Sequence, residues 1–214
     1  MLLIKKGKEP NSLTMYKKQS NAYYNGYDKG DVRKALLKEQ GYLCAYCMRR
    51  ISEDKMKIEH YIPQSNSDNK EALNYNNMLG VCLGNSGAKQ KYENLTCDSH
   101  RGNAELVVNP MVKASIDLIK YMDDGTIYSD NADINKDLNE TLNLNCNDSL
   151  LKVNRARVLS DIKRHLYAQQ RNGIWKKELL NRMIKKFSTF DSDGKLREYS
   201  GVILYYLNNR IKKC

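Results

Sequence analysis

The chain has 214 residues, of which 41% are hydrophobic and 29% charged, with only three prolines, so its composition is that of a globular protein and not of a disordered one. No stretch is long and apolar enough to predict a membrane span, and the start MLLIKKGKEP fits neither a signal peptide nor an anchor, which favours a cytoplasmic protein. The formal net charge of +11 favours a polyanionic partner such as nucleic acid.

The first 30 residues predict an extended arm. They are polar and rich in Lys, Asn and Tyr, show little periodicity, and carry turn signals at NG and KG near their end. From Asp31 the segment DVRKALLKEQ places apolar residues at helical spacing, and Gly41 supplies a stop signal. We therefore expect a helix that leads the chain into a cysteine-rich segment.

Residues 41–103 hold four of the six cysteines and two of the three histidines. Cys44 and Cys47 form a Cys-x-x-Cys pair whose thiolates can point at one ion, and Cys82 and Cys97 bring the number to the four ligands of a closed tetrahedral zinc site. In a reducing compartment this spacing favours metal over disulfides. The insert between Cys82 and Cys97 must fold back for this to work, and the alternative is that these two cysteines are merely buried.

Two short strands are predicted inside this segment. Residues 56–61 alternate apolar and polar side chains until Pro63, and MLGVCL is a second short apolar run. Glu59 and His60 come near the end of the first strand. A carboxylate can hold a hard cation while a neutral imidazole takes a proton from water, and phosphodiester hydrolysis needs both roles. A lone histidine is more often a hydrogen-bonded structural residue, so the pair alone does not define a site.

After the cysteine-rich segment the pattern predicts a strand and a hairpin. LVVNP at 106–110 is typical of a strand stopped by its proline, and residues 115–128 predict two strands around a DG turn. We divide the chain into an arm over 1–30, a core over 31–110, and a hairpin followed by a helical region over 111–214.

The last part of the chain predicts helices. Asp148 or Ser149 can cap a long helix that Gly173 breaks, and two more amphipathic segments follow at about 174–188 and 196–212.

Basic residues concentrate in this helical part. Residues 1–144 carry 20 Lys and Arg against 19 Asp and Glu, whereas residues 145–214 carry 16 against 6. We interpret the basic part as the one that grips a polyanion, although a solvated basic helical surface would give the same counts. The candidate nucleic-acid contacts on it are Lys152, Arg155, Lys163 and Arg164.

Several of these motifs together resemble a known family. The order Cys-x-x-Cys, Glu-His-x-x-Pro, an asparagine five residues before the third cysteine, and a fourth cysteine followed by polar residues resembles HNH endonucleases, whose ββα-metal fold carries a one-metal nuclease site. More closely, EQGYLCAYCMRRI, IEHYIP and TCDSHRGN resemble the PtuB-type HNH endonucleases of the Septu anti-phage system, which also occur with retrons. The match spans about 41–103.

The resemblance implies partners as well as an activity. They are a nucleic-acid substrate, a PtuA-like ATPase and, in retron-associated members, a reverse transcriptase with its RNA–DNA product. Any ATP site would belong to the partner, because GVCLGNSGAK lacks the order G-x-x-x-x-G-K-[ST].

Roles for three residues follow from the resemblance. His60 matches the general base, and Asn77 matches the asparagine that pins the loop bearing this base. Glu59 matches the acidic residue that helps to bind the catalytic Mg²⁺ or Mn²⁺.

The chain departs from the family pattern after the last cysteine. Many relatives have a His or Asn directly after it, whereas here Asp98 stands in that place and His100 comes two residues later. Either can be the second ligand of the catalytic metal, and Asp98 suits a hard cation better. Arg101 matches a family Lys or Arg that contacts a backbone phosphate.

The sequence thus predicts an α+β protein with a ββα-metal (HNH) nuclease core, a structural zinc, a small hairpin and a basic C-terminal helical region. A non-catalytic zinc-containing module that binds nucleic acid or a partner would carry the same cysteines and the same basic tail. No motif chooses between DNA and RNA as the substrate.

Overall fold

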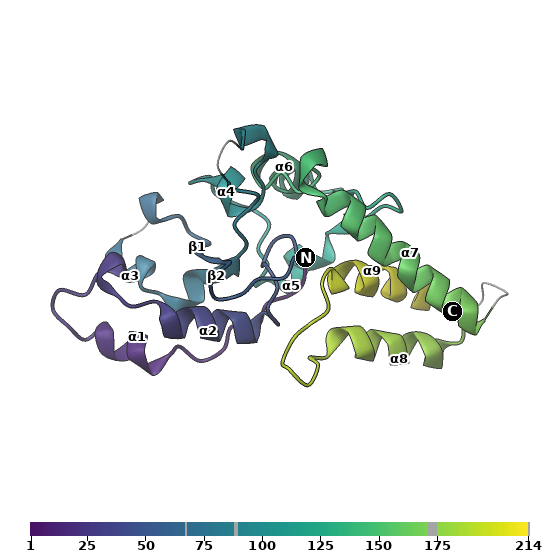
Figure 1. The fold of residues 1–214 in the computed structure, drawn as a ribbon, viewed down its shortest axis with the longest axis horizontal. Helices are drawn as coiled ribbons and strands as arrows, with labels where there is room; N and C mark the ends of the chain where they lie inside the picture. The colour runs from purple at the N-terminus through teal and green to yellow at the C-terminus, as the bar shows by residue number, and fades with distance from the viewer. Residues whose placement is uncertain (67, 88–89, 171–174, 214) are drawn as a thin grey trace.

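The computed structural model describes residues 1–66, 68–87, 90–170 and 175–213. Helices surround two small antiparallel hairpins, and one hydrophobic core runs from the first residues to the last helix. The molecule is elongated, with the N-terminal helices at one end and the three long C-terminal helices at the other (Figure 1). The mixed helix-and-sheet class predicted from the sequence is confirmed.

The N-terminal part is more helical than the sequence suggested. Helix α2 spans Gly30–Glu39, as expected, and buries one apolar face. The prediction of an extended arm is wrong over Asn11–Tyr16, which form helix α1, because Leu13 of this segment is completely buried in the core. Packing of one apolar side chain outweighs a sequence with little periodicity. A 3₁₀ turn follows at Tyr24–Gly26.

The two predicted short strands form an antiparallel hairpin. Strand β1 spans Lys57–His60 and strand β2 spans Met78–Val81, with Glu59 opposite Leu79. The connection contains helix α3 and two 3₁₀ turns, at Asn69–Ala72, Gln64–Asn66 and Tyr75–Asn77. Gln40 at the end of α2 holds the outer edge of β2, since its side chain donates to Gly80 O and accepts from Gly80 N at 2.7 Å each.

The strand predicted at 106–110 does not form. Val107 and Val108 instead donate their backbone N–H groups to Oδ2 of Asp137, at 2.6 and 2.8 Å. A single buried carboxylate therefore satisfies the amides that a neighbouring strand would have paired. Asp137 lies in a π-helical turn, Asp137–Thr141, that continues helix α6, Ala132–Lys136.

The predicted DG hairpin is confirmed in a shorter form. Strands β3, Lys120–Tyr121, and β4, Ile127–Tyr128, pair on either side of the turn. The residues just before them form helix α5, Lys113–Asp117, where the sequence had predicted the beginning of the first strand.

Three long helices complete the fold. After a 3₁₀ turn at Asn147–Ser149, helix α7 spans Leu151–Gln169, α8 spans Lys177–Ser188 and α9 spans Ser200–Ile211. Helices α8 and α9 lie side by side beneath α7 (Figure 1). The predicted helix break at Gly173 lies outside the described residues.

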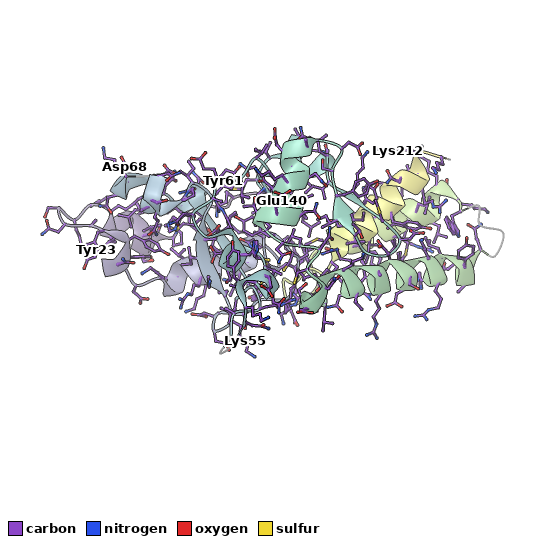
Figure 2. All side chains as sticks on the ribbon, turned by 90° about the horizontal axis from the view of Figure 1, so that it is seen from above. Tyr23, Lys55, Tyr61, Asp68, Glu140 and Lys212 are labelled. Atoms are coloured by element: carbon purple, nitrogen blue, oxygen red, sulfur yellow. The ribbon has the colours of Figure 1, made fainter. Side chains whose placement is uncertain are left out.

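Tyr23 and Asp68 mark one end of the molecule and Lys212 the other (Figure 2). Within the described residues, no helix is both long and apolar enough to cross a membrane.

Candidate functional site

The four cysteines predicted to bind zinc meet in one buried cluster. The Sγ atoms of Cys44, Cys47, Cys82 and Cys97 all lie within 4.8 Å of one another. The Sγ–Sγ distance is 3.7 Å for Cys47–Cys82, 3.8 Å for Cys82–Cys97 and 3.9 Å for Cys44–Cys97. The cysteines are free, and these distances exceed the roughly 2.05 Å of a disulfide bond.

The geometry of the quartet fits zinc. A Zn–S bond is about 2.3 Å, so a regular tetrahedron of sulfurs has edges of about 3.8 Å. These three pairs have this spacing. Contact with the other three cysteines and burial raise the pKa of the Cys97 thiol, so that thiolates at this position require a nearby cation. The four cysteines could therefore hold a metal ion such as zinc, and the quartet is the only cluster of three or more such ligands in the described part of the chain.

Local backbone geometry brings the two halves of the quartet together. Cys44 and Cys47 lie in a tight turn that is closed by Met48 N donating to Cys44 O at 3.0 Å. The insert after Cys82 folds back as predicted, with Thr96 N donating to Gly84 O at 2.9 Å. Gly84 has φ +59°, and a Cβ there would lie 2.1 Å from the Thr96 carbonyl oxygen. Only glycine fits this return of the chain.

Two acidic side chains face each other beside this cluster. Glu59 of β1 is 6% exposed, and Asp98 is one of the groups that act on its carboxyl group. Asp98 begins helix α4, Asp98–Arg101, directly after the last cysteine. Burial, reinforced by Asp98, raises the pKa of Glu59 to about 8, against the opposing effect of Arg101. Lys57, on the same face of β1, donates to Asp98 Oδ2 at 3.1 Å.

Arg101 is the buried cation that contacts Glu59. Its side chain is fully buried and donates to the Glu59 carboxylate, to Tyr46 Oη at 3.2 Å and to the backbone oxygen of Tyr61 at 2.7 Å. Further bonds reach the carbonyls of His60 and Ala104. The expectation that Arg101 contacts a backbone phosphate is therefore corrected, because its donors are taken up inside the protein.

His60 lies on the other face of the hairpin, since side chains alternate along a strand. Its ring is 6% exposed; Nε2 is 2.9 Å from Ala72 O and Nδ1 is 3.1 Å from Nε2 of Gln64. A carbonyl oxygen only accepts, so Nε2 carries the proton and Nδ1 keeps a lone pair. Burial lowers the pKa of His60, which keeps the imidazole neutral. The ring of Tyr24 packs edge-on against it, with centroids 4.6 Å apart.

Asn77 lies where an asparagine that pins the His60 loop is expected. Its Oδ1 accepts from Ile62 N at 2.7 Å, and its Nδ2 donates to Ile62 O at 3.1 Å. These two side-chain hydrogen bonds continue the strand pairing beyond His60 and fix the turn that leads to Pro63.

The structure separates the two candidates for the second ligand. Asp98 lies at Glu59, whereas His100 turns away, with Nδ1 3.0 Å from Thr141 O and its ring stacked on Tyr92 at 4.3 Å. Asp98 is the better placed of the two.

The basic residues predicted on the C-terminal helices have different environments. Arg155 is 1% exposed and donates to Gly125 O at 2.6 Å, so its expected contact with nucleic acid is corrected to a structural role. Lys152 pairs with Asp124 at 2.8 Å, and Lys163 pairs with Asp123 at 2.7 Å. Arg164 is largely exposed and pairs with Asp161 within its own helix.

Sequence reasoning missed Tyr46, Lys57 and Gln64. Tyr46 is completely buried inside the Cys-x-x-Cys turn and donates to Glu59 Oε1 at 3.1 Å. The alternation of β1 gave one usable signal, because it puts Lys57 on the face of Glu59.

No protein-family model matches this chain, and no curated protein sequence matches it. What its site does must accordingly be inferred from its own residues.

Proposed function

We propose that the protein is a metal-dependent endonuclease of the HNH type that hydrolyses phosphodiester bonds of nucleic acid. The observation that carries the proposal is the neighbouring carboxyl groups of the buried Glu59 and the half-buried Asp98 next to the cysteine quartet, with the neutral His60 following Glu59 on the other face of the same strand. Magnesium is usually bound by one or two carboxylates together with substrate phosphates, and this pair offers that ligand set.

In this proposal the cysteine quartet holds a structural zinc, and Glu59 and Asp98 hold one Mg²⁺ or Mn²⁺. The cation supplies the Lewis acid that stabilises the leaving oxygen. The positive charge of this cation would also offset the repulsion between the Glu59 and Asp98 carboxylates, which water reaches poorly.

His60 is the general base of the proposed reaction. Its Nε2–H is fixed by the Ala72 carbonyl, so the lone pair of Nδ1 takes the proton from the attacking water. The amide of Gln64 now occupies that lone pair, and it marks the position of the water. Strand β1 ends at His60, and Asn77 fixes the turn that follows it, so the imidazole lies at the end of the hairpin.

The test is cleavage of plasmid, single-stranded DNA and tRNA with Mg²⁺ or Mn²⁺, with and without EDTA. Asp98→Asn keeps the shape of a half-buried side chain and removes its charge, and His60→Asn removes the base; each should lower cleavage by about 10²-fold or more. Zinc content should remain close to wild type in both variants, and both should stay folded at the assay temperature, although His60→Asn loses the buried hydrogen bond to Ala72 O. Asp117→Asn on the surface of α5 is the matched control. Cleavage retained in both site variants would overturn the proposal.

A second candidate function is a non-catalytic zinc module that binds nucleic acid or a partner. One observation favours it, namely that both ring nitrogens of His60 are engaged within the protein. In that case nucleic acid is not cleaved, and neither EDTA nor His60→Asn alters the result. Charge reversals over 152–186 then weaken binding and flatten its salt dependence.

The sequence resemblance adds a setting to the nuclease proposal. We infer an anti-phage complex with a PtuA-like ATPase, and in a retron setting also a reverse transcriptase with its RNA–DNA product. Co-purification with the products of adjacent genes tests this, and the cleavage assay is repeated with any complex that forms.

A further inference from the structure

We propose that Tyr24, Lys29 and Arg33 form a phosphate-binding surface beside His60, which takes the nucleic-acid backbone next to the bond to be cut. We call these three residues the Tyr24 cluster. The inference rests on the proposed nuclease function and names the part of the chain that positions its substrate.

The cluster is built on the candidate base itself. The Tyr24 ring packs against the imidazole of His60 with an interplanar angle of 80°. Lys29 Nζ lies 4.5 Å from the centroid of the Tyr24 ring. Among the described residues, Lys29 forms no salt bridge with a carboxylate. Arg33 follows one helical turn later, with its N–H bonded to Lys29 O at 2.9 Å. Two cations therefore stand on the same side of α2 as the imidazole.

The charges of these two cations are not neutralised by the described part of the protein. Neither Lys29 nor Arg33 has an ion pair there, and Lys29 makes only a long bond of 3.4 Å to Tyr27 O. The Nε of Arg33 is buried without a hydrogen-bond partner among the described residues. Buried polar groups are nearly always satisfied, so a ligand that accepts from this guanidinium fits the site.

The acidic residues at the start of α2 face another way. Asp28, Asp31 and Lys34 line a hollow against Ser12 and Met15 of α1. Lys34 lines this hollow and serves as a control lysine on another side of the same helix.

The segment that carries Tyr24 is tied to helix α3. Asn69 of α3 donates from Nδ2 to Ala22 O at 2.6 Å. Burial raises the pKa of Tyr24 to about 12, so its hydroxyl stays protonated and able to donate. The neighbouring Tyr23 is 56% exposed at the same end of the molecule as Asp68 (Figure 2). An exposed aromatic ring next to a phosphate contact can stack on a base of any sequence.

A lysine, an arginine and a phenol are the groups that bind phosphate oxygens without reading sequence. The ligand class is thus a nucleic-acid backbone, and the predicted effect is on affinity and position, with little effect on sequence preference.

The test measures binding of a short labelled oligonucleotide in EDTA over a series of salt concentrations, using Lys29→Met with Arg33→Met. Each lost phosphate contact lowers the slope of log K against log salt by about 0.9 for duplex DNA or about 0.7 for a single strand. We expect a fall of about 1.4 to 1.8 for the double variant, none for Lys34→Met, and a raised KM with kcat retained in the cleavage assay.

Each result decides between the two proposals. If the double variant keeps the wild-type slope and KM, the Tyr24 cluster is not a phosphate site, while the nuclease proposal stands. If wild-type protein neither binds nor cleaves nucleic acid, both proposals fail. Should the double variant fail to fold, Lys29→Met and Arg33→Lys are measured singly: half the fall in slope for Lys29→Met supports the cluster, and unchanged slopes and KM in both overturn it.

Discussion

Replacement of Arg101 by methionine is the sharpest test of the buried architecture. The guanidinium is completely buried and pairs with Glu59, whose side chain is 8% exposed. At a pH above the Glu59 pKa of about 8, where the carboxyl group is ionised, removing its buried partner leaves that charge without compensation and costs about 3–5 kcal/mol. A small domain has about 5–15 kcal/mol in total, so this single change consumes a large part of its stability. Methionine fills much of the space that the aliphatic part of the arginine side chain occupies, so a cavity contributes little to the loss of stability.

The loss of hydrogen bonds acts in the same direction. Arg101 also donates to Tyr46 Oη and to the carbonyls of His60, Tyr61 and Ala104. A buried acceptor without a partner costs about 1–3 kcal/mol, although water that enters the space can satisfy some of these groups. We therefore expect a loss of at least about 3 kcal/mol.

The assay is urea unfolding at about pH 9, above the Glu59 pKa of about 8, in zinc-containing buffer with the cysteines reduced. Arg164→Met is the control, because Arg164 is 79% exposed and pairs only with Asp161 on its own helix, and we expect a change within about 0.5 kcal/mol. Glu59→Gln in the Arg101→Met background should recover part of the loss, since it removes the uncompensated charge. A loss below about 1 kcal/mol for Arg101→Met would refute the structural role and favour the phosphate contact expected from the sequence.

Three further changes test the rest of the site. Cys82→Ser should remove the bound zinc, measured as metal per chain, and leave the cysteine-rich segment unfolded, because structural zinc contributes on the order of 10 kcal/mol; full zinc content would contradict the quartet. Gly84→Ala should destabilise by about 1–3 kcal/mol and weaken zinc binding in a chelator competition, since its Cβ would meet Thr96 O at 2.1 Å; a neutral effect would show that the return loop is not strained. Asn77→Ala should cost about 1–3 kcal/mol by leaving Ile62 N without its acceptor and Ile62 O without its donor; an unchanged thermal unfolding midpoint would show that these hydrogen bonds do not stabilise the turn.

The cysteine quartet was predictable because it needs little more than counting. A Cys-x-x-Cys turn fixes two ligands locally, and two further cysteines in the same short segment have few other reasons to be there. The need for the insert to fold back followed from the same logic. What the spacing did not reveal is how the return is made, which depends on the left-handed backbone of Gly84.

The burial of Glu59 and His60 was not predictable from their own strand. Alternation along β1 placed them on opposite faces, but their low exposure comes from segments distant in sequence. The arm covers His60 through Tyr24, and α4 covers Glu59 through Arg101. Similarly, the apolar pattern at 106–110 indicated a strand, whereas Asp137, far along the chain, satisfies the amides of Val107 and Val108.

The distribution of charge shows why totals over long segments mislead. The excess of basic residues in 145–214 suggested a grip on polyanion, yet Arg155 is buried, and Lys152 and Lys163 are paired with aspartates of the preceding hairpin turn. The part that was nearly neutral by count places Lys29 and Arg33 without described carboxylate partners beside the candidate base. A phosphate responds to the charges within about a Debye length of its own position, close to 10 Å at moderate salt. Local pairing, which the sequence does not display, therefore decides which charges remain available to a polyanion.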